Sequence, residues 1–159
     1  MKSVIITESY FGNTATIAEE LAAGLTDAGA EATVLTAEDA LNGPGSSADL
    51  VILAAPTHNI GLPTEKTRAQ ATEKGAGRGS GAGVREWVDA ASGSDARIIA
   101  VSTTTGGFMA GSAAKAAVKA LKKKGVTADR GEDFTVTDVP GPLAEGEKER
   151  ARAWARTLL

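Results

Sequence analysis

Short apolar segments alternate with longer stretches of helical periodicity along the whole chain. This alternation is typical of parallel strands joined by helical crossovers, because each crossover returns the chain to the same edge of the sheet. Right-handed crossovers place helices on both faces, so the pattern predicts a three-layer, doubly wound α/β sandwich with a five-stranded parallel sheet. A ligand is expected beyond the carboxyl ends of the strands. The predicted strands are residues 4–7, 32–35, 50–55, 97–101 and 133–136.

The helical stretches carry their apolar residues on one face. In the first, Ile17, Leu21 and Leu25 repeat at four-residue spacing, and Asn13 or Thr14 is a candidate N-cap. The third strand segment is apolar throughout, which predicts a central strand buried on both faces. Trp87 and Trp154 fall on apolar helix faces and are expected in the core, and further helices are predicted at residues 63–73, 84–91, 112–124 and 143–158.

Residues 75–83 interrupt this pattern, with glycine at every second position and no apolar residue larger than alanine. Such a composition cannot form a packed element, so we predict a flexible insertion. Two interpretations of it stay open. A lid over a second substrate favours an enzyme, whereas tolerated variation in a surface loop carries no function.

The composition excludes several kinds of site. The chain has 159 residues, no cysteine and one histidine. The length matches a single domain spanning residues 1–159. Without cysteine there are no disulfides, thiolate metal ligands or cysteine nucleophiles, and one histidine makes a zinc site or a catalytic triad hard to assemble. Demanding chemistry is therefore expected from a bound cofactor.

Charge and the N-terminal segment bear on location and partners. No charged leader with a long apolar stretch opens the chain, which predicts a cytoplasmic protein that does not enter membranes. The net charge is −3, and the one dense basic run, residues 122–124, lies in the last turn of a predicted helix, where it complements the helix dipole. Nucleic acid is therefore not an expected partner.

The segment 8–14 between the first strand and the first helix is suited to an anion. Gly12 permits a sharp turn, and the hydroxyls of Ser9 and Thr14 can donate beside the free N–H groups of the helix start. No lysine is present, which argues against a triphosphate loop and favours one monophosphate. A plain strand-to-helix turn capped by Asn13 or Thr14 explains the same segment.

The loops after the third and fourth strands also end at the expected ligand edge. Gly61, Gly106 and Gly107 let the backbone approach a planar ligand closely. Ordinary connecting turns use threonine and glycine as well, so each loop by itself fits either interpretation. The side chains that can bond polar ring edges are Thr57, Asn59, Thr103, Thr104 and Thr105.

Together these segments resemble the flavodoxin family. The S-x-F-G-N-T sequence of residues 9–14, followed by Ile17 and Ala18, resembles the phosphate loop of that family. Pro56-Thr57-His58 resembles its second loop, and residues 103–111 followed by 112–115 resemble its third. The resemblance covers essentially the whole chain and implies a flavodoxin-like fold with strand order 2-1-3-4-5.

The resemblance also implies a cofactor, flavin mononucleotide (FMN), and the residues around it. The first loop would bind the phosphate, and the second and third would hold the isoalloxazine ring. The implied cofactor-binding residues are Ser9, Tyr10, Phe11, Gly12, Asn13, Thr14, Pro56, Thr57, His58, Asn59, Ile60, Gly61, Thr103, Thr104, Thr105, Gly106, Gly107 and Phe108.

The chain departs from the family pattern at three points. Phe11 stands where a hydroxyl residue is expected, which removes one phosphate donor. The ring loops offer only His58 and Phe108, with Met109 adjacent, in place of the usual tryptophan or tyrosine. Flavodoxins that carry electrons are strongly acidic, whereas this chain is close to charge balance, so long-range steering of a protein partner is weak.

Two aromatic residues in these loops have open roles. His58 has an ordinary pKa close to physiological pH and is the candidate catalytic residue, relaying a proton to a reduced flavin or a bound quinone. A neutral packing residue is the alternative. Tyr10 either covers the ribityl chain of the flavin or faces solvent.

The expected function is that of an FMN-binding protein in electron transfer, with a redox protein or a small acceptor as its partner. One alternative is an FMN-dependent NAD(P)H oxidoreductase that reduces a quinone or another small acceptor. Another is a flavodoxin-like binding domain that has lost flavin.

Overall fold

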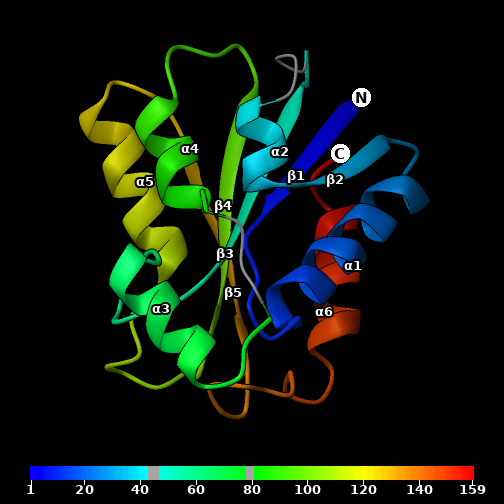
Figure 1. Cartoon of the computed structure of the whole chain (residues 1–159). Coiled ribbons are helices and arrows are strands. Elements are labelled where there is room, and N and C mark those ends of the chain that lie inside the picture. The colour runs from blue at the N-terminus through cyan, green and yellow to red at the C-terminus, as the bar shows by residue number, and fades with distance from the viewer. Residues whose placement is uncertain (43–46, 78–80) are drawn as a thin grey trace.

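The five apolar segments form one parallel sheet in the computed structural model, which describes residues 1–42, 47–77 and 81–159 (Figure 1). The strand order is β2-β1-β3-β4-β5, which confirms the predicted doubly wound sheet. Every residue of β3 but the last is buried, and β3 pairs with β1 and β4, as its continuous apolar sequence predicts. The strands are β1 (Lys2–Thr7), β2 (Glu31–Thr36), β3 (Leu50–Pro56), β4 (Arg97–Thr104) and β5 (Asp129–Thr135).

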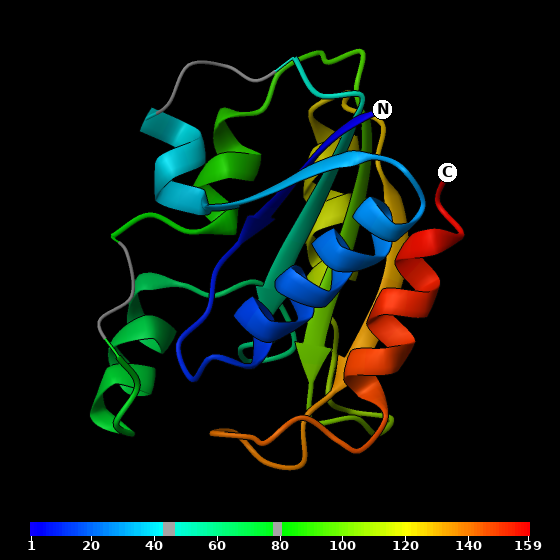
Figure 2. The same cartoon turned by 90° about the vertical axis from the view of Figure 1, so that its right-hand side faces the viewer.

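Helices cover both faces of the sheet (Figures 1 and 2). On one face, Ile17, Leu21 and Leu25 of α1 are fully buried in a core that α6 shares. The two helices pack closely because Gly24 has no side chain: a Cβ there would lie 2.3 Å from the carbonyl oxygen of Arg152. The elements of this face are α1 (Asn13–Asp27) and α6 (Glu147–Arg156), and those of the other face are α2 (Ala37–Asn42), α4 (Val84–Ala90) and α5 (Ala113–Lys123).

Helix α3 (Glu65–Glu73) lies apart from these layers, beyond the carboxyl ends of the strands (Figure 1). Its start is well defined, since Thr64 and Thr67 form a reciprocal capping box. Its sequence is almost entirely polar, and its buried residues are Thr67, Arg68 and Ala71. It therefore does not cover the sheet in the way that an amphipathic helix does.

Several element boundaries differ from the sequence predictions. The short helix α2 was not predicted, and β5 begins at Asp129, although the polar sequence of its first half has no strand pattern. Helix α6 begins only after Gly146, whose φ of 82° is left-handed and ends the irregular segment before it. Trp87 and Trp154 are packed against the two cores but only partly buried.

The glycine-rich segment carries no helix or strand in its described part, and residues 78–80 lie outside the described residues. Its predicted flexibility stays a prediction. Within the described ranges, no helix is both long and apolar enough to cross a membrane.

Candidate functional site

A cleft lies at the carboxyl ends of the strands, where the loops after β1, β3 and β4 and the segment after β5 meet. Most of the predicted site residues line it: Ser9, Tyr10, Phe11, Asn13, Thr14, Pro56, Thr57, His58, Asn59, Thr103, Thr104 and Thr105. Gly12, Ile60 and Gly61 do not line it, and Gly106, Gly107 and Phe108 line a neighbouring hollow. Residues outside the prediction complete the lining: Thr67, Gln70, Ala71, Lys74, Val136 and Val139.

The turn before α1 leaves hydrogen-bond donors unpaired. Gly12 is the N-cap, with a left-handed φ of 88°, and α1 has no side-chain cap. Within the described residues, the N–H groups of Asn13, Thr14 and Ala15 have no acceptor. The alternative of a turn capped by Asn13 or Thr14 is therefore wrong.

The side chains around this turn bond elsewhere or not at all. Asn13 Nδ2 donates to the carbonyl oxygen of Pro140 at 3.3 Å, and Thr14 Oγ1 lies 2.8 Å from Thr103 Oγ1. Ser9 Oγ is buried and has no partner within the described chain. The hydroxyls of Ser3 and Thr7 in β1 are buried and unpaired as well, so the lack of a partner is not particular to Ser9. What makes this turn a candidate place for an anion is that the unpaired hydroxyl of Ser9 lies in the same segment as the free N–H groups.

The loop after β3 is a tight turn with a strained residue. His58 and Gly61 exchange backbone hydrogen bonds of 2.9 and 3.0 Å, and both central residues have positive φ, 44° at Asn59 and 67° at Ile60. A β-branched residue rarely adopts this conformation. Ile60 is held there beside Gly111, where any Cβ would lie 2.3 Å from the Ile60 Cα. Strained backbone of this kind is concentrated at functional sites. No pattern in the sequence indicates the left-handed conformation of Ile60.

His58 is held on two sides. Its Nδ1 lies 2.9 Å from Thr67 Oγ1 of α3, and its ring centroid is 5.4 Å from that of Tyr10. Its Nε2 has no partner among the described residues. Burial lowers the pKa of His58 below its usual value, with a smaller contribution from the positive charges of Arg68 and Lys74 and an opposing one from Glu8. The imidazole is therefore neutral at pH 7.

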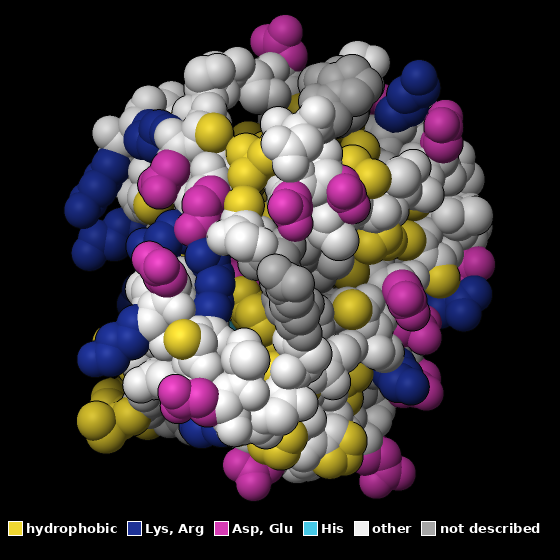
Figure 3. All heavy atoms as spheres, viewed as in Figure 1, with side chains coloured by type: hydrophobic (Ala, Val, Ile, Leu, Met, Phe, Trp, Pro, Cys, Tyr) yellow, Lys and Arg dark blue, Asp and Glu magenta, His cyan; other side chains and the backbone are white. Residues whose placement is uncertain are grey.

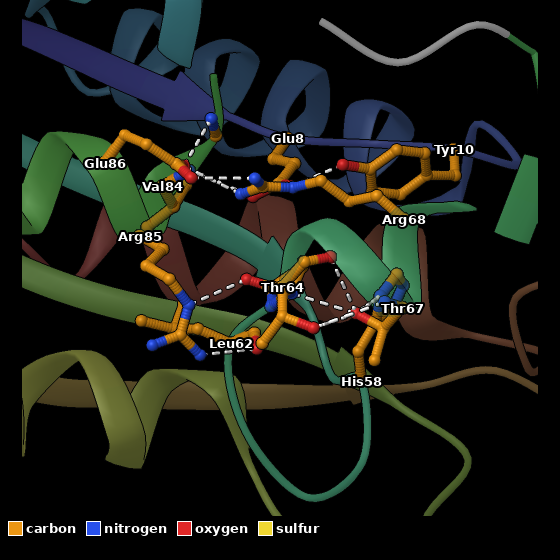
Figure 4. A network of polar contacts seen from close by, with 12 residues as sticks. Glu8, Tyr10, His58, Leu62, Thr64, Thr67, Arg68, Val84, Arg85 and Glu86 are labelled. Atoms are coloured by element: carbon orange, nitrogen blue, oxygen red, sulfur yellow. Dashed lines mark hydrogen bonds and ion pairs between the residues drawn. The ribbon is translucent and has the colours of Figure 1, made fainter. Parts of the chain in front are cut away.

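A buried ionic network connects this site to α3 and α4 (Figure 4). Glu8, with 2 % of its side chain exposed, accepts hydrogen bonds from the Tyr10 phenol at 2.5 Å, from Arg68 Nε at 2.8 Å and from the Val84 N–H at 2.9 Å. Arg68 also binds Glu86 through both of its terminal nitrogens at 2.8 and 2.7 Å. This bidentate pairing lowers the pKa of Glu86 to about 2.

The network decides the orientation of Tyr10. Its ring is buried, and burial together with the bond to Glu8 raises the pKa of the phenol. The expectation of a solvent-facing ring is therefore wrong, while contact with a ribityl chain stays a prediction. Sequence analysis missed the network because Glu8 and Arg68 are 60 residues apart. The one local signal was the Thr64 cap of α3, which places Arg68 one residue beyond the capping box.

The loop after β4 combines fixed and exposed residues. It ends at Ser112, the N-cap of α5, whose hydroxyl accepts from the N–H of Lys115. Thr57 Oγ1, from the loop after β3, accepts from the N–H of Ala113 at the start of the same helix. Phe108 is fully exposed, at 105 %, and its neighbour Met109 is exposed as well. Hydrophobic side chains gather at the lower edge in Figure 3, where the strands end. Apart from the two chain ends, the exposed large hydrophobic residues of the described chain are Ile60, Phe108, Met109 and Val139.

Comparison with solved structures shows the same fold at low sequence identity. Oxidised flavodoxin 1 from Bacillus cereus is 17 % identical with a TM-score of 0.60, over 98 % of this chain and 95 % of that one. Two-electron reduced Megasphaera elsdenii flavodoxin is 17 % identical with a TM-score of 0.58, over 99 % of both chains. A flavodoxin from the domain Archaea is 14 % identical with a TM-score of 0.62, over 99 % of this chain and 96 % of that one.

Comparison with protein families gives a direct assignment. No curated protein matches the chain. The flavodoxin family model matches residues 5–128, which run from the middle of β1 to beyond α5 and include the loops that form most of the cleft. The chain therefore belongs to the flavodoxin family, whose members bind flavin, usually FMN, and transfer electrons to redox partners.

Proposed function

We propose that this chain binds FMN in the cleft and transfers electrons through it to a redox partner. The observation that carries the proposal is the set of unpaired donors at the start of α1. Ser9 Oγ is buried without a partner, beside helix N–H groups that also lack acceptors. A phosphate oxygen satisfies both kinds of donor, and the positive end of the helix dipole favours its charge.

The cleft also fits the ring-bearing part of FMN. Pro56, Asn59 and Thr105 line it beside the phosphate turn, so ribityl and ring atoms would find apolar and polar neighbours at the strand ends. Bound FMN supplies reversible one- and two-electron transfer. The chain would bind and orient it, and the N–H groups of these loops would stabilise negative charge at its pyrimidine edge.

A specific observation favours a second candidate, an FMN-dependent NAD(P)H oxidoreductase that reduces a quinone or another small acceptor. The Tyr10 hydroxyl is held by Glu8 and its ring, which lines the cleft, packs against His58, while Phe108 extends into solvent, so neither ring is free to stack over a bound flavin. The neutral His58 offers an unpaired Nε2 beside this open space. It would accept or return a proton as the acceptor is reduced.

Flavin titration tests the proposal. Quenching of flavin fluorescence gives the dissociation constants for FMN, FAD and riboflavin. We expect FMN to bind most tightly, because a phosphate held by several donors adds about 2 to 4 kcal/mol. Equal affinity for riboflavin would contradict the phosphate site, and no binding of any flavin would leave the flavin-free domain as the correct alternative.

Steady-state assays separate the two redox roles. The FMN-loaded protein is mixed with NADH or NADPH and a soluble quinone, and in parallel with a flavodoxin reductase. Reduction only by the reductase supports an electron carrier. Direct turnover with a nicotinamide that falls in His58→Ala, while FMN affinity is retained, supports the oxidoreductase.

A further inference from the structure

The charge of the cleft lining is one-sided. Among the described residues that line it there is one lysine, Lys74, and there is no arginine, aspartate or glutamate. The remaining polar lining consists of hydroxyls, amides and a neutral imidazole. A cleft with one cation and no carboxylate suits an anionic ligand, because no negative charge opposes it.

Lys74 is also free to act on a ligand. It follows the last turn of α3 as the C-cap residue, and within the described residues its ammonium has no ion pair or hydrogen bond. Arg68 of the same helix is by contrast held by two carboxylates. The positive charge of Lys74 reaches His58, whose pKa it lowers. The flexible stem of a lysine lets this charge follow a ligand within the cleft.

The phosphate turn lacks such a charge of its own. Its donors are backbone N–H groups and hydroxyls, and the side chain of Phe11, between Ser9 and Gly12, has no donor. A phosphate monoester carries a charge of about −1.5 to −2 near neutral pH, which neutral donors compensate only in part. Lys74 at the end of α3 and the turn before α1 line the same cleft.

We propose that Lys74 pairs with the phosphate of the bound flavin and so determines the preference for a phosphorylated ligand. The inference rests on the proposed FMN site and deepens it. It makes α3 part of the recognition of the cofactor. The competing explanation is that Lys74 only complements the dipole at the carboxyl end of α3, which would affect helix stability and leave ligand preference unchanged.

The experiment compares FMN with riboflavin in three proteins: wild type, Lys74→Gln and Lys66→Gln. Lys66 is a matched control because it lies on α3, is exposed and does not line the cleft. We expect Lys74→Gln to weaken FMN binding about tenfold and to leave riboflavin binding unchanged, as for the loss of one charged hydrogen bond. Lys66→Gln should alter neither, and Lys74→Arg should retain the preference.

Salt provides a second readout that does not depend on redox activity. The FMN affinity of the wild type should fall between 0.05 and 0.5 M NaCl more steeply than that of Lys74→Gln, because screening acts on the charge pair. Urea unfolding of each variant shows whether α3 has been disturbed.

The outcomes separate this inference from the proposed function. A wild type that prefers FMN, with a preference that survives in Lys74→Gln, overturns the inference alone. An equal loss of FMN and riboflavin affinity in Lys74→Gln also overturns it, since the lysine would then act on the ring or on the fold. Equal wild-type affinity for both flavins, or no flavin binding, contradicts the FMN site and the inference together.

Discussion

Helices α1 and α3 each form a wall of the cleft and are held in place by different physical effects. Helix α1 buries an unbroken apolar face, with Ile17, Leu21 and Leu25 at 0 % exposure. Helix α3 has no large apolar residue and is attached through Arg68, which lies between two carboxylates. The stabilisation gained by burying apolar surface does not depend on direction, whereas an ion pair requires each partner to be in one position.

This difference indicates how the site is built. The hydrophobic core fixes α1 and with it the turn at Gly12, independently of any single polar contact. The position of α3, and therefore of Thr67 and Lys74, depends on a buried carboxylate at the end of β1. Buried ion pairs add little net stability compared with apolar residues, but they specify one arrangement. We infer that the network fixes the position of the second wall.

The largest effect is expected when this attachment is removed. Arg68→Met leaves the Glu8 carboxylate, 2 % exposed, without its ionic partner, and should lower the free energy of unfolding by about 3 to 5 kcal/mol. Urea unfolding measures the loss. Native-state hydrogen exchange should show the amides of α3 opening more readily than those of α1, because α1 keeps its apolar contacts.

A second substitution provides the control for that experiment. Adding Glu8→Gln to Arg68→Met removes the unpaired charge and should recover part of the loss. Equal acceleration of exchange in α1 and α3 would contradict the independent attachment of the two walls.

An intermediate effect is expected at the turn that begins α1. Gly12 has a φ of 88° and a Cβ position in open space, so Gly12→Val should cost about 1 to 2 kcal/mol of backbone strain and also obstruct the phosphate. Gly29 is a matched control, since its φ is 93° and its Cβ position is equally open. Gly29→Val should show a similar loss in urea unfolding and normal FMN affinity. Equal FMN affinity in the two variants would show that the phosphate lies elsewhere.

The smallest effect is expected at Thr67 of α3. Its one hydroxyl proton can go to the Thr64 carbonyl at 3.2 Å or to Nδ1 of His58 at 2.9 Å. We infer that it goes to the carbonyl, so that Thr67 accepts a hydrogen bond from Nδ1–H of His58. Thr67→Val removes that acceptor and also the Thr67 half of the capping box, at a cost of about 1 kcal/mol. It should lower the pKa of His58 further, because the protonated ring loses a partner. Thr67→Ser should restore it. NMR of the single histidine measures both its tautomer and its pKa. A rise in the pKa of His58 in Thr67→Val would show that the Thr67 hydroxyl donates to the imidazole instead.

The depressed pKa also has a consequence for stability. Burial lowers the pKa of His58 in the folded protein below its value of about 6.5 in the unfolded chain, so the unfolded chain binds the proton more readily. The contribution of neutral His58 to stability is present above pH 6.5 and is lost as the pH falls through the folded pKa. In His58→Gln, the free energy of unfolding should depend less on pH below about 6.5 than in the wild type.

The sequence by itself determined the sheet, most of the helices on its faces and the turn at Gly12 that begins α1. The continuous apolar sequence of β3 and the apolar periodicity of α1 indicate which sides of each element are buried. They do so because the free energy gained by burying apolar surface is roughly proportional to its area, whatever the partner. The strand order followed from the family resemblance. Most residues named from the three loops line the cleft because parallel strands bring their carboxyl ends, and so these loops, to one edge of the sheet.

Only the tertiary structure decided the second wall of the cleft. The attachment of α3, the burial of Tyr10 against Glu8 and the left-handed backbone of Ile60 depend on groups that are distant in sequence. The polar first half of β5 becomes a strand because β4 offers it a partner along the edge of the sheet. Hydrogen bonds and ion pairs are directional and short-ranged, so they exist only once the fold has brought both partners together, and no periodicity along the chain records them.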